Sequence, residues 1–188
     1  MGPPKDERKP PVDAPASITS RPDPTVAAAV ISPSAQAVVQ TMLVVRDADR
    51  AIAFYERVFG AREVWRVMHF HRVGHAVLRI GRSEIVVLDE FPEAGILAPD
   101  SDSINLAVPR LLIEIEDVDA VLERAIAAGA TVLRGAEDQW WGVRSGVIRD
   151  PFGYRWSIHS VMEAISADEI QRRADALGLY PPLQPGDV

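Results

Sequence analysis

The amino-acid sequence repeats one order of predicted elements, and this repeat constrains the fold more than any other feature. The first copy has a strand, a helix and three further strands, over residues 40–46, 48–59, 62–70, 75–80 and 83–88. The second copy has the same order, over residues 111–116, 118–128, 131–134, 143–149 and 154–160. An Asp precedes each helix as an N-cap, and a Gly follows each helix. We therefore expect an α+β fold built from two βαβββ modules.

Residues 140–159, WWGVRSGVIRDPFGYRWSIH, carry the most informative local pattern. Pro151 has a fixed φ and Gly153 permits a positive φ, so the Asp-Pro-Phe-Gly turn is consistent with a hairpin between two strands. After the turn, large apolar residues alternate with Arg155, Ser157 and His159. The alternation predicts a strand that packs Trp156 against a helix and lines a cavity with its other face.

The two ends of the chain differ in composition from its middle. Residues 1–36 contain eight of the fifteen prolines and charges of both signs, and such a segment buries too little apolar surface to offset its ordering entropy. We expect a flexible tail over 1–36 and a domain over 37–160, with modules at about 38–91 and 108–160. A C-terminal helix and tail are expected over 161–188.

The composition argues against several classes of partner. A formal net charge of −7 is unsuited to the phosphate backbone of nucleic acid and mildly favours a cationic ligand. The sequence has no uninterrupted run of about 18 apolar residues, the length that would predict a membrane span. The chain has no Cys, which removes disulfides and thiolate metal sites and suits a reducing cytoplasm. We therefore expect a cytoplasmic protein that binds neither nucleic acid nor membrane.

One motif stands in each half of the chain, DADRAIAFYERVFG over 47–60 and DPFGYRW over 150–156. These motifs resemble the vicinal oxygen chelate superfamily of glyoxalases, extradiol dioxygenases and bleomycin-resistance proteins, and the resemblance covers about residues 38–160. The segment over 140–159 is most similar to the bleomycin-resistance and glyoxalase-like branch. The resemblance implies mixed sheets that curl into half-barrels around a shared cavity, which a homodimer often completes.

The resemblance also indicates where a metal ion would bind, because the metal-dependent members carry ligands at four inward-facing strand positions. In this sequence these positions fall on Gln40, within 85–88 and nearest Val87, close to Arg110, and on Ser157, where those enzymes carry Glu. A divalent ion needs several His or carboxylate donors, which these residues do not supply. The resemblance therefore implies a member without a metal cofactor.

The spacing of three histidines leaves one alternative open. His69 and His71 share a strand face, and His75 begins the next strand after Gly74. If a hairpin brings the three imidazoles together, they form a site for a divalent metal; if it does not, they are surface histidines.

Strand alternation, combined with the geometry of the family, assigns a set of residues to the predicted pocket. The ligand-binding candidates are Gln40, Trp65, His75, Arg79, Arg110, Trp141, Arg155, Ser157 and His159. Aromatic walls with a few polar groups suit a planar or amphipathic small molecule. Arg110 and Glu114 share a strand face, and the simplest role for them is an ion pair. The alternative is catalytic, with Glu114 as a general base near His159.

Three functions are open at this point. The leading hypothesis is a metal-independent protein of the bleomycin-resistance type that sequesters an antibiotic or another natural product. The second is an enzyme of the same fold, a lyase, isomerase or tailoring enzyme, with an unusual metal site or none. The third is a regulatory or scaffold protein that engages a partner through residues 1–36. The sequence does not decide whether there is turnover.

Overall fold

A computed structural model describes residues 39–99 and 108–178. The expected tail over 1–36 lies outside the described residues, and so do the second half of the connection between the modules and the last residues of the chain. In the part of the chain that is described, no helix is long and apolar enough to cross a membrane.

The first module is a helix packed on a four-stranded mixed sheet. Its elements are β1 (Thr41–Val45), α2 (Ala48–Phe59), β2 (Arg62–His69), β3 (Arg72–Ile80) and β4 (Ser83–Asp89). The strand order is β1-β4-β3-β2, with β1 parallel to β4 and the other pairs antiparallel. As the sequence predicts, the Asp47 side chain caps the helix by accepting from the amide of Arg50 at 3.0 Å, and Gly60 ends it with a φ of 67°.

The second module repeats this arrangement. Its elements are β5 (Arg110–Glu114), α3 (Val118–Ala127), β6 (Thr131–Asp138), β7 (Val143–Arg149) and β8 (Arg155–Val161). The order is β5-β8-β7-β6, again with one parallel pair, β5 and β8. The two βαβββ modules are thus confirmed. Strand β6 continues to Asp138 rather than ending at Arg134, because its polar end pairs with β7 across a shift in register.

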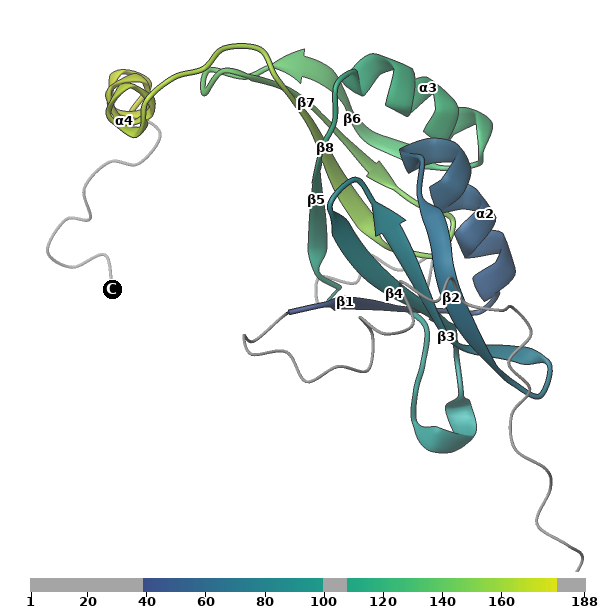
Figure 1. Ribbon diagram of the computed structural model, residues 1–188. Helices are drawn as coiled ribbons and strands as arrows, with labels where there is room; N and C mark the ends of the chain where they lie inside the picture. The colour runs from purple at the N-terminus through teal and green to yellow at the C-terminus, as the bar shows by residue number, and fades with distance from the viewer. Residues whose placement is uncertain (1–38, 100–107, 179–188) are drawn as a thin grey trace, which may run out of the picture.

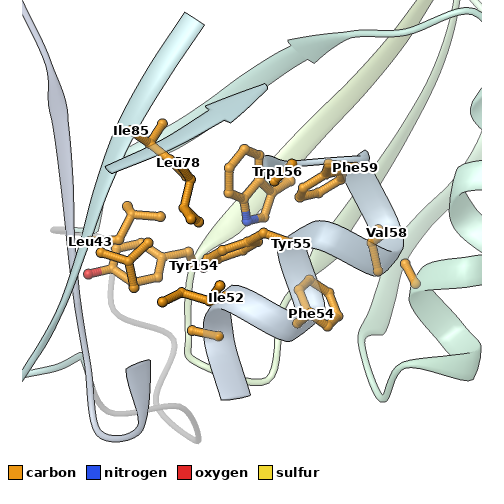
Figure 2. Packing of buried hydrophobic residues seen from close by; sticks show 14 of the residues in the cluster. Leu43, Ile52, Phe54, Tyr55, Val58, Phe59, Leu78, Ile85, Tyr154 and Trp156 are labelled. Carbon is orange, nitrogen blue, oxygen red and sulfur yellow. The ribbon is translucent and has the colours of Figure 1, made fainter. Parts of the chain in front are cut away.

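The two helices lie side by side on one side of the sheets (Figure 1), and the modules share one hydrophobic core. Figure 2 shows α2 at its centre: the ring of Trp156, on β8, lies 4.6 Å from that of Phe59 and 5.5 Å from that of Tyr55. The expected packing of Trp156 on a helix is confirmed, and the helix belongs to the other module. The C-terminal strand of one module therefore closes the core of its neighbour.

Residues that alternate with the core residues lie on the opposite face of each sheet, which we name the open face. In β3, Ala76 and Leu78 belong to the shared core, whereas Val77 packs in a separate small cluster with Val86 and Leu88 of β4. No described helix covers this second cluster, since α2 and α3 both pack on the other side. The open faces are therefore where the fold can admit a ligand.

Two short elements lie outside the modules. A single 3₁₀ turn, η1 (Pro92–Ala94), follows β4, and α4 (Ala167–Ala176) follows β8. Helix α4 stands apart from the sheets at the end of an extended segment (Figure 1). It is tied back through Arg173, which donates to the carbonyl oxygen of Trp140 at 3.1 Å and pairs with Glu163 at 3.0 Å.

Candidate functional site on the open sheet faces

Strand register arranges the open face of the second module as three rows that cross β5, β8 and β7. The first row is Arg110, Arg155 and Arg149; the second is Leu112, Ser157 and Val147; the third is Glu114, His159 and Ser145. The neighbours Trp156 and Ile148 are core residues, so alternation directs the side chains of these rows away from the helices. Four of the predicted ligand-binding residues thus share one face, as expected: Arg110, Arg155, Ser157 and His159.

A fourth strand supplies one more cation to this face. Arg134 of β6 pairs in register with Val147, and its guanidinium donates to the Ser145 hydroxyl at 2.8 Å. The second row therefore extends to Arg134, and the hydrogen bond from Arg134 to Ser145 links the second row to the third row. Ser157, at the centre of this face, is only 6% exposed.

The open face of the first module is mainly apolar. One row joins Met42, Val86, Val77 and Trp65 across the four strands. The Trp65 ring stacks on that of His75, with centroids 5.0 Å apart and planes 15° apart. The indole Nε1 of Trp65 is buried, and no described residue accepts a hydrogen bond from it. An unpartnered buried donor costs about 1–3 kcal/mol, so this atom is a ready contact for an acceptor on a ligand.

Burial sets the protonation of the two histidines on these faces. Desolvation lowers the pKa of His75. Desolvation also lowers the pKa of His159; the Arg134 cation acts in the same direction, and the Glu114 carboxylate opposes it. With pKa values below the ordinary value of about 6.5, both imidazoles are mostly neutral at pH 7 and can accept a hydrogen bond or a proton.

Three other predicted ligand-binding residues lie at the margins of the faces. Gln40 is exposed just before β1, and Arg79 is held in an ion pair with Glu84 at 2.7 Å. Trp141 lies in the turn before β7, at the end of the strand away from Asp150, with its ring 5.0 Å from that of Trp140. Strand alternation does not apply to these two indoles, because β7 begins only at Val143.

The ion pair expected between Arg110 and Glu114 is not among those formed by the described residues. Both side chains lie on the same face of β5, but they are four residues apart on an extended strand, which is about 13 Å. Glu114 instead pairs in register with His159 of β8. The structure thus brings together the two residues of the catalytic alternative.

The three histidines of the predicted metal alternative are not brought together. His69 packs edge-on against Phe70 and Phe91, His71 lies in the exposed turn after β2, and His75 stacks on Trp65. Among residues 39–99 and 108–178, no three His, Asp or Glu side chains are grouped so as to hold a metal ion. Strand β2 ends at His69, so His71 falls in the turn, and the shifted register pairs His69 with Arg72 and His75 with Val67.

The positions of the family's metal ligands do not fit a metal ion in this chain either. Val87, nearest the second position, lies in the shared core on the helix side of β4. The open-face residues next to it, Val86 and Leu88, offer no donor atom. Ser157 has a hydroxyl where the metal-dependent enzymes carry a carboxylate. Because a divalent ion needs several strong donors, this donor set does not hold one.

A groove of about 790 Å³ runs between the modules along β5. β5 is an edge strand, and the groove is lined by both of its faces, by the β3–β4 turn and by the start of β1. Arg110, Leu112 and Glu114 form part of its wall. The groove therefore gives a ligand access to the β5 residue of each of the three rows.

Sequence reasoning missed two residues of this site, Arg149 and Arg134. Arg149 immediately precedes the Asp-Pro-Phe-Gly turn and was assigned only to a strand, although its alternation with the buried Ile148 indicates the open face. Arg134 carried no usable signal, because the register of β6 shifts twice against β7.

The model of the Glyoxalase/Bleomycin resistance protein/Dioxygenase superfamily matches residues 37–158. An uncharacterized protein of Mycobacterium tuberculosis is 38% identical over 138 residues, which are 72% of this chain and 81% of the relative. A protein of Mycobacterium bovis has the same identity over 138 residues, which are 91% of its length.

Solved structures are similar to this chain as well. TioX from Micromonospora sp. ML1 is 27% identical, with a TM-score of 0.53, and the match covers 67% of this chain and 99% of TioX. The fosfomycin resistance protein FosX from Mesorhizobium loti is 19% identical, with a TM-score of 0.52, over 74% of this chain and 99% of FosX. At this identity, the likeness to FosX concerns the fold alone.

Proposed function

Because this chain belongs to the glyoxalase/bleomycin resistance protein/dioxygenase superfamily, we propose that it binds a small organic molecule on its open sheet faces, without a metal ion. The observation that carries the proposal is the apolar row that ends at Trp65, whose buried Nε1 has no acceptor among the described residues. A pocket that joins aromatic and aliphatic walls to a few polar groups is the usual form of a small-molecule site. The biological role we propose is sequestration of an antibiotic or another natural product.

The proposal includes a homodimer, because the open faces carry apolar side chains that a lone chain leaves in water. Met42 is 54% exposed and Leu112 is 63% exposed, one on each sheet. Val161 and Met162 are exposed as well, at the start of the segment that leads to α4. A second copy seated over these side chains would remove them from solvent and close the site. A cytoplasmic location stays a prediction.

A second candidate function is an enzyme of the same fold, a lyase, isomerase or tailoring enzyme. It is favoured by the cross-strand pair of Glu114 and His159. The lowered pKa of His159 makes its imidazole available as a general base at neutral pH. The scaffold hypothesis depends on residues 1–36, which lie outside the described residues.

The test is a thermal-shift and calorimetric screen of the full chain, treated with EDTA, against aromatic natural products. We expect at least one compound to raise Tm and to be recovered unchanged by mass spectrometry. Trp65→Ala should then weaken its binding by about tenfold or more, as expected for a central aromatic contact. Trp65→Phe, which keeps a smaller aromatic ring but has no Nε1 donor, should give a smaller loss.

The matched control is Ile126→Ala, which truncates an exposed apolar residue of α3 on the other side of the sheet. It should bind the compound as the unaltered protein does. A screen in which no compound raises Tm would overturn the proposal. Binding that appears only after a divalent metal is restored would overturn metal-free binding, and chemical change of the compound would establish the enzyme instead.

A further inference from the structure

We infer that Arg110, Arg155 and Arg149 form an anion-binding row, which receives the acidic group of an amphipathic ligand. The inference rests on the proposed small-molecule function and specifies the chemistry of its ligand. Arg155 pairs in register with Arg110 on one side and with Arg149 on the other. The three guanidinium side chains therefore leave adjacent strands at the same level of the sheet and on the same face.

The spacing of this row suits one anionic group. Neighbouring strands lie about 4.8 Å apart, so the ends of three long, flexible side chains can converge on the oxygens of a single carboxylate or phosphate. Guanidinium groups bind such anions through paired hydrogen bonds. Without an anion, like charges directly opposite on adjacent strands destabilise the sheet.

The protein itself does not neutralise the row in the described part of the chain. Six other arginines make ion pairs there, namely Arg66, Arg72, Arg79, Arg144, Arg172 and Arg173, but none of the three in the row does. The carboxylate of Glu114 lies on the same face but two rows away. A cationic row in a chain of net charge −7 is not a consequence of overall composition.

The residues beside the row define the rest of the ligand. Leu112, Ser157 and Val147 form the next row, so an acidic group on the arginines places its attached body over two apolar side chains and one hydroxyl. Leu112 is largely exposed and is available for such a contact. The overall charge mildly favours a cationic ligand, whereas the side chains of this face favour an organic anion. The ligand class is thus an acid with an apolar body.

The experiment measures binding of phenyl phosphate, benzoate, inorganic phosphate and neutral benzamide to the full chain, by calorimetry at constant ionic strength in chloride. We expect the two aromatic anions to bind more tightly than inorganic phosphate, and benzamide not to bind measurably. The comparison of phenyl phosphate with benzoate identifies the preferred acidic group. Arg155→Gln should weaken binding of the preferred anion by about tenfold to a hundredfold, the range expected for hydrogen bonds to a charged group.

Arg57→Gln, an exposed arginine of α2, is the matched control and should leave the affinity unchanged. Arg155→Lys keeps the charge, so its loss of affinity reports the paired hydrogen bonds and guards against misfolding of the Gln variant. Equal effects of the Arg155 and Arg57 variants would overturn the inference, as would equal binding of inorganic and phenyl phosphate. If natural products bind but none of these anions does, the inference fails while the proposed function stands; if nothing binds, both fail.

Discussion

The hydroxyl of Tyr154 hydrogen-bonds both main-chain polar groups of Val44: it accepts from the amide nitrogen at 2.8 Å and donates to the carbonyl oxygen at 3.0 Å. Tyr154 follows the Asp-Pro-Phe-Gly turn of the second module, whereas Val44 lies on β1, an edge strand of the first. Burial raises the pKa of Tyr154 to about 12, so its proton is retained at neutral pH. One side chain therefore continues the hydrogen bonding of β1 into the other module.

Tyr154→Phe should lower the free energy of unfolding by about 1–3 kcal/mol, because it leaves an amide and a carbonyl of Val44 without their partner. Urea denaturation followed by fluorescence measures the change. Thr131→Val, which deletes an exposed hydroxyl of β6, should stay within about 0.5 kcal/mol of the unaltered protein. Similar values for the two variants would show that the Tyr154 contact does not stabilise the fold.

Asp150→Asn should be among the more destabilising single substitutions, with a loss of about 1–3 kcal/mol or more. The Asp150 carboxylate is 2% exposed and accepts four hydrogen bonds at 2.9 Å, from the amides of Phe152 and Tyr154, the Tyr55 hydroxyl and Trp156 Nε1. An amide nitrogen in place of either oxygen would face a donor that cannot accept: the Trp156 indole at Oδ2, or the main-chain amides of Phe152 and Tyr154 at Oδ1.

The control for this prediction is Asp138→Asn, which removes an exposed ion pair with Arg144. Exposed pairs contribute about 0–1 kcal/mol, so this variant should unfold close to the unaltered protein. The comparison is made by thermal and urea denaturation at pH 7. If Asp150→Asn costs no more than Asp138→Asn, the buried carboxylate does not hold the turn as we describe.

Stability should fall as the pH is lowered below about 6.5, the ordinary pKa of histidine. The pKa values of His75 and His159 are lowered in the folded protein, mainly by desolvation. Between the folded and unfolded pKa values, the unfolded chain binds more protons, so the unfolding free energy increases with pH across this window. The double variant His75→Gln/His159→Gln should have a flatter profile between pH 5 and 7.5. Titration by NMR with midpoints at or above about 6.5 would contradict the expected shifts.

Gly142→Ala should loosen the segment that leads to α4. Gly142 has a φ of 81°, and a Cβ there would lie 2.9 Å from the carbonyl oxygen of Glu163. Its own carbonyl oxygen accepts from the amides of Met162 and Glu163 at 2.9 and 3.0 Å. We expect faster hydrogen exchange at these two amides. Gly135→Ala, where a Cβ would meet nothing within 4 Å, should leave their exchange unchanged.

The helices and the core faces of the strands could be predicted because their signals are local. Asp47 and Asp117 cap helices within three residues of themselves, and alternation along β8 places Trp156 and Ile158 in the core. Contacts between side chains on different strands were harder to predict from the sequence. The expected pairing of Arg110 with Glu114 failed because it ignored the length of an extended strand. The site at His69, His71 and His75 failed because β2 ends before His71 and the hairpin shifts its register.

The sequence by itself determined that two similar modules form, where each helix begins, and which residues of β8 turn away from the core. Only the tertiary structure decided which residues meet. Trp156 packs on the helix of the other module, and Arg149 takes its place beside Arg155 and Arg110. Capping and alternation depend on neighbours a few residues apart, whereas register and module packing depend on contacts between distant segments, which no local pattern encodes.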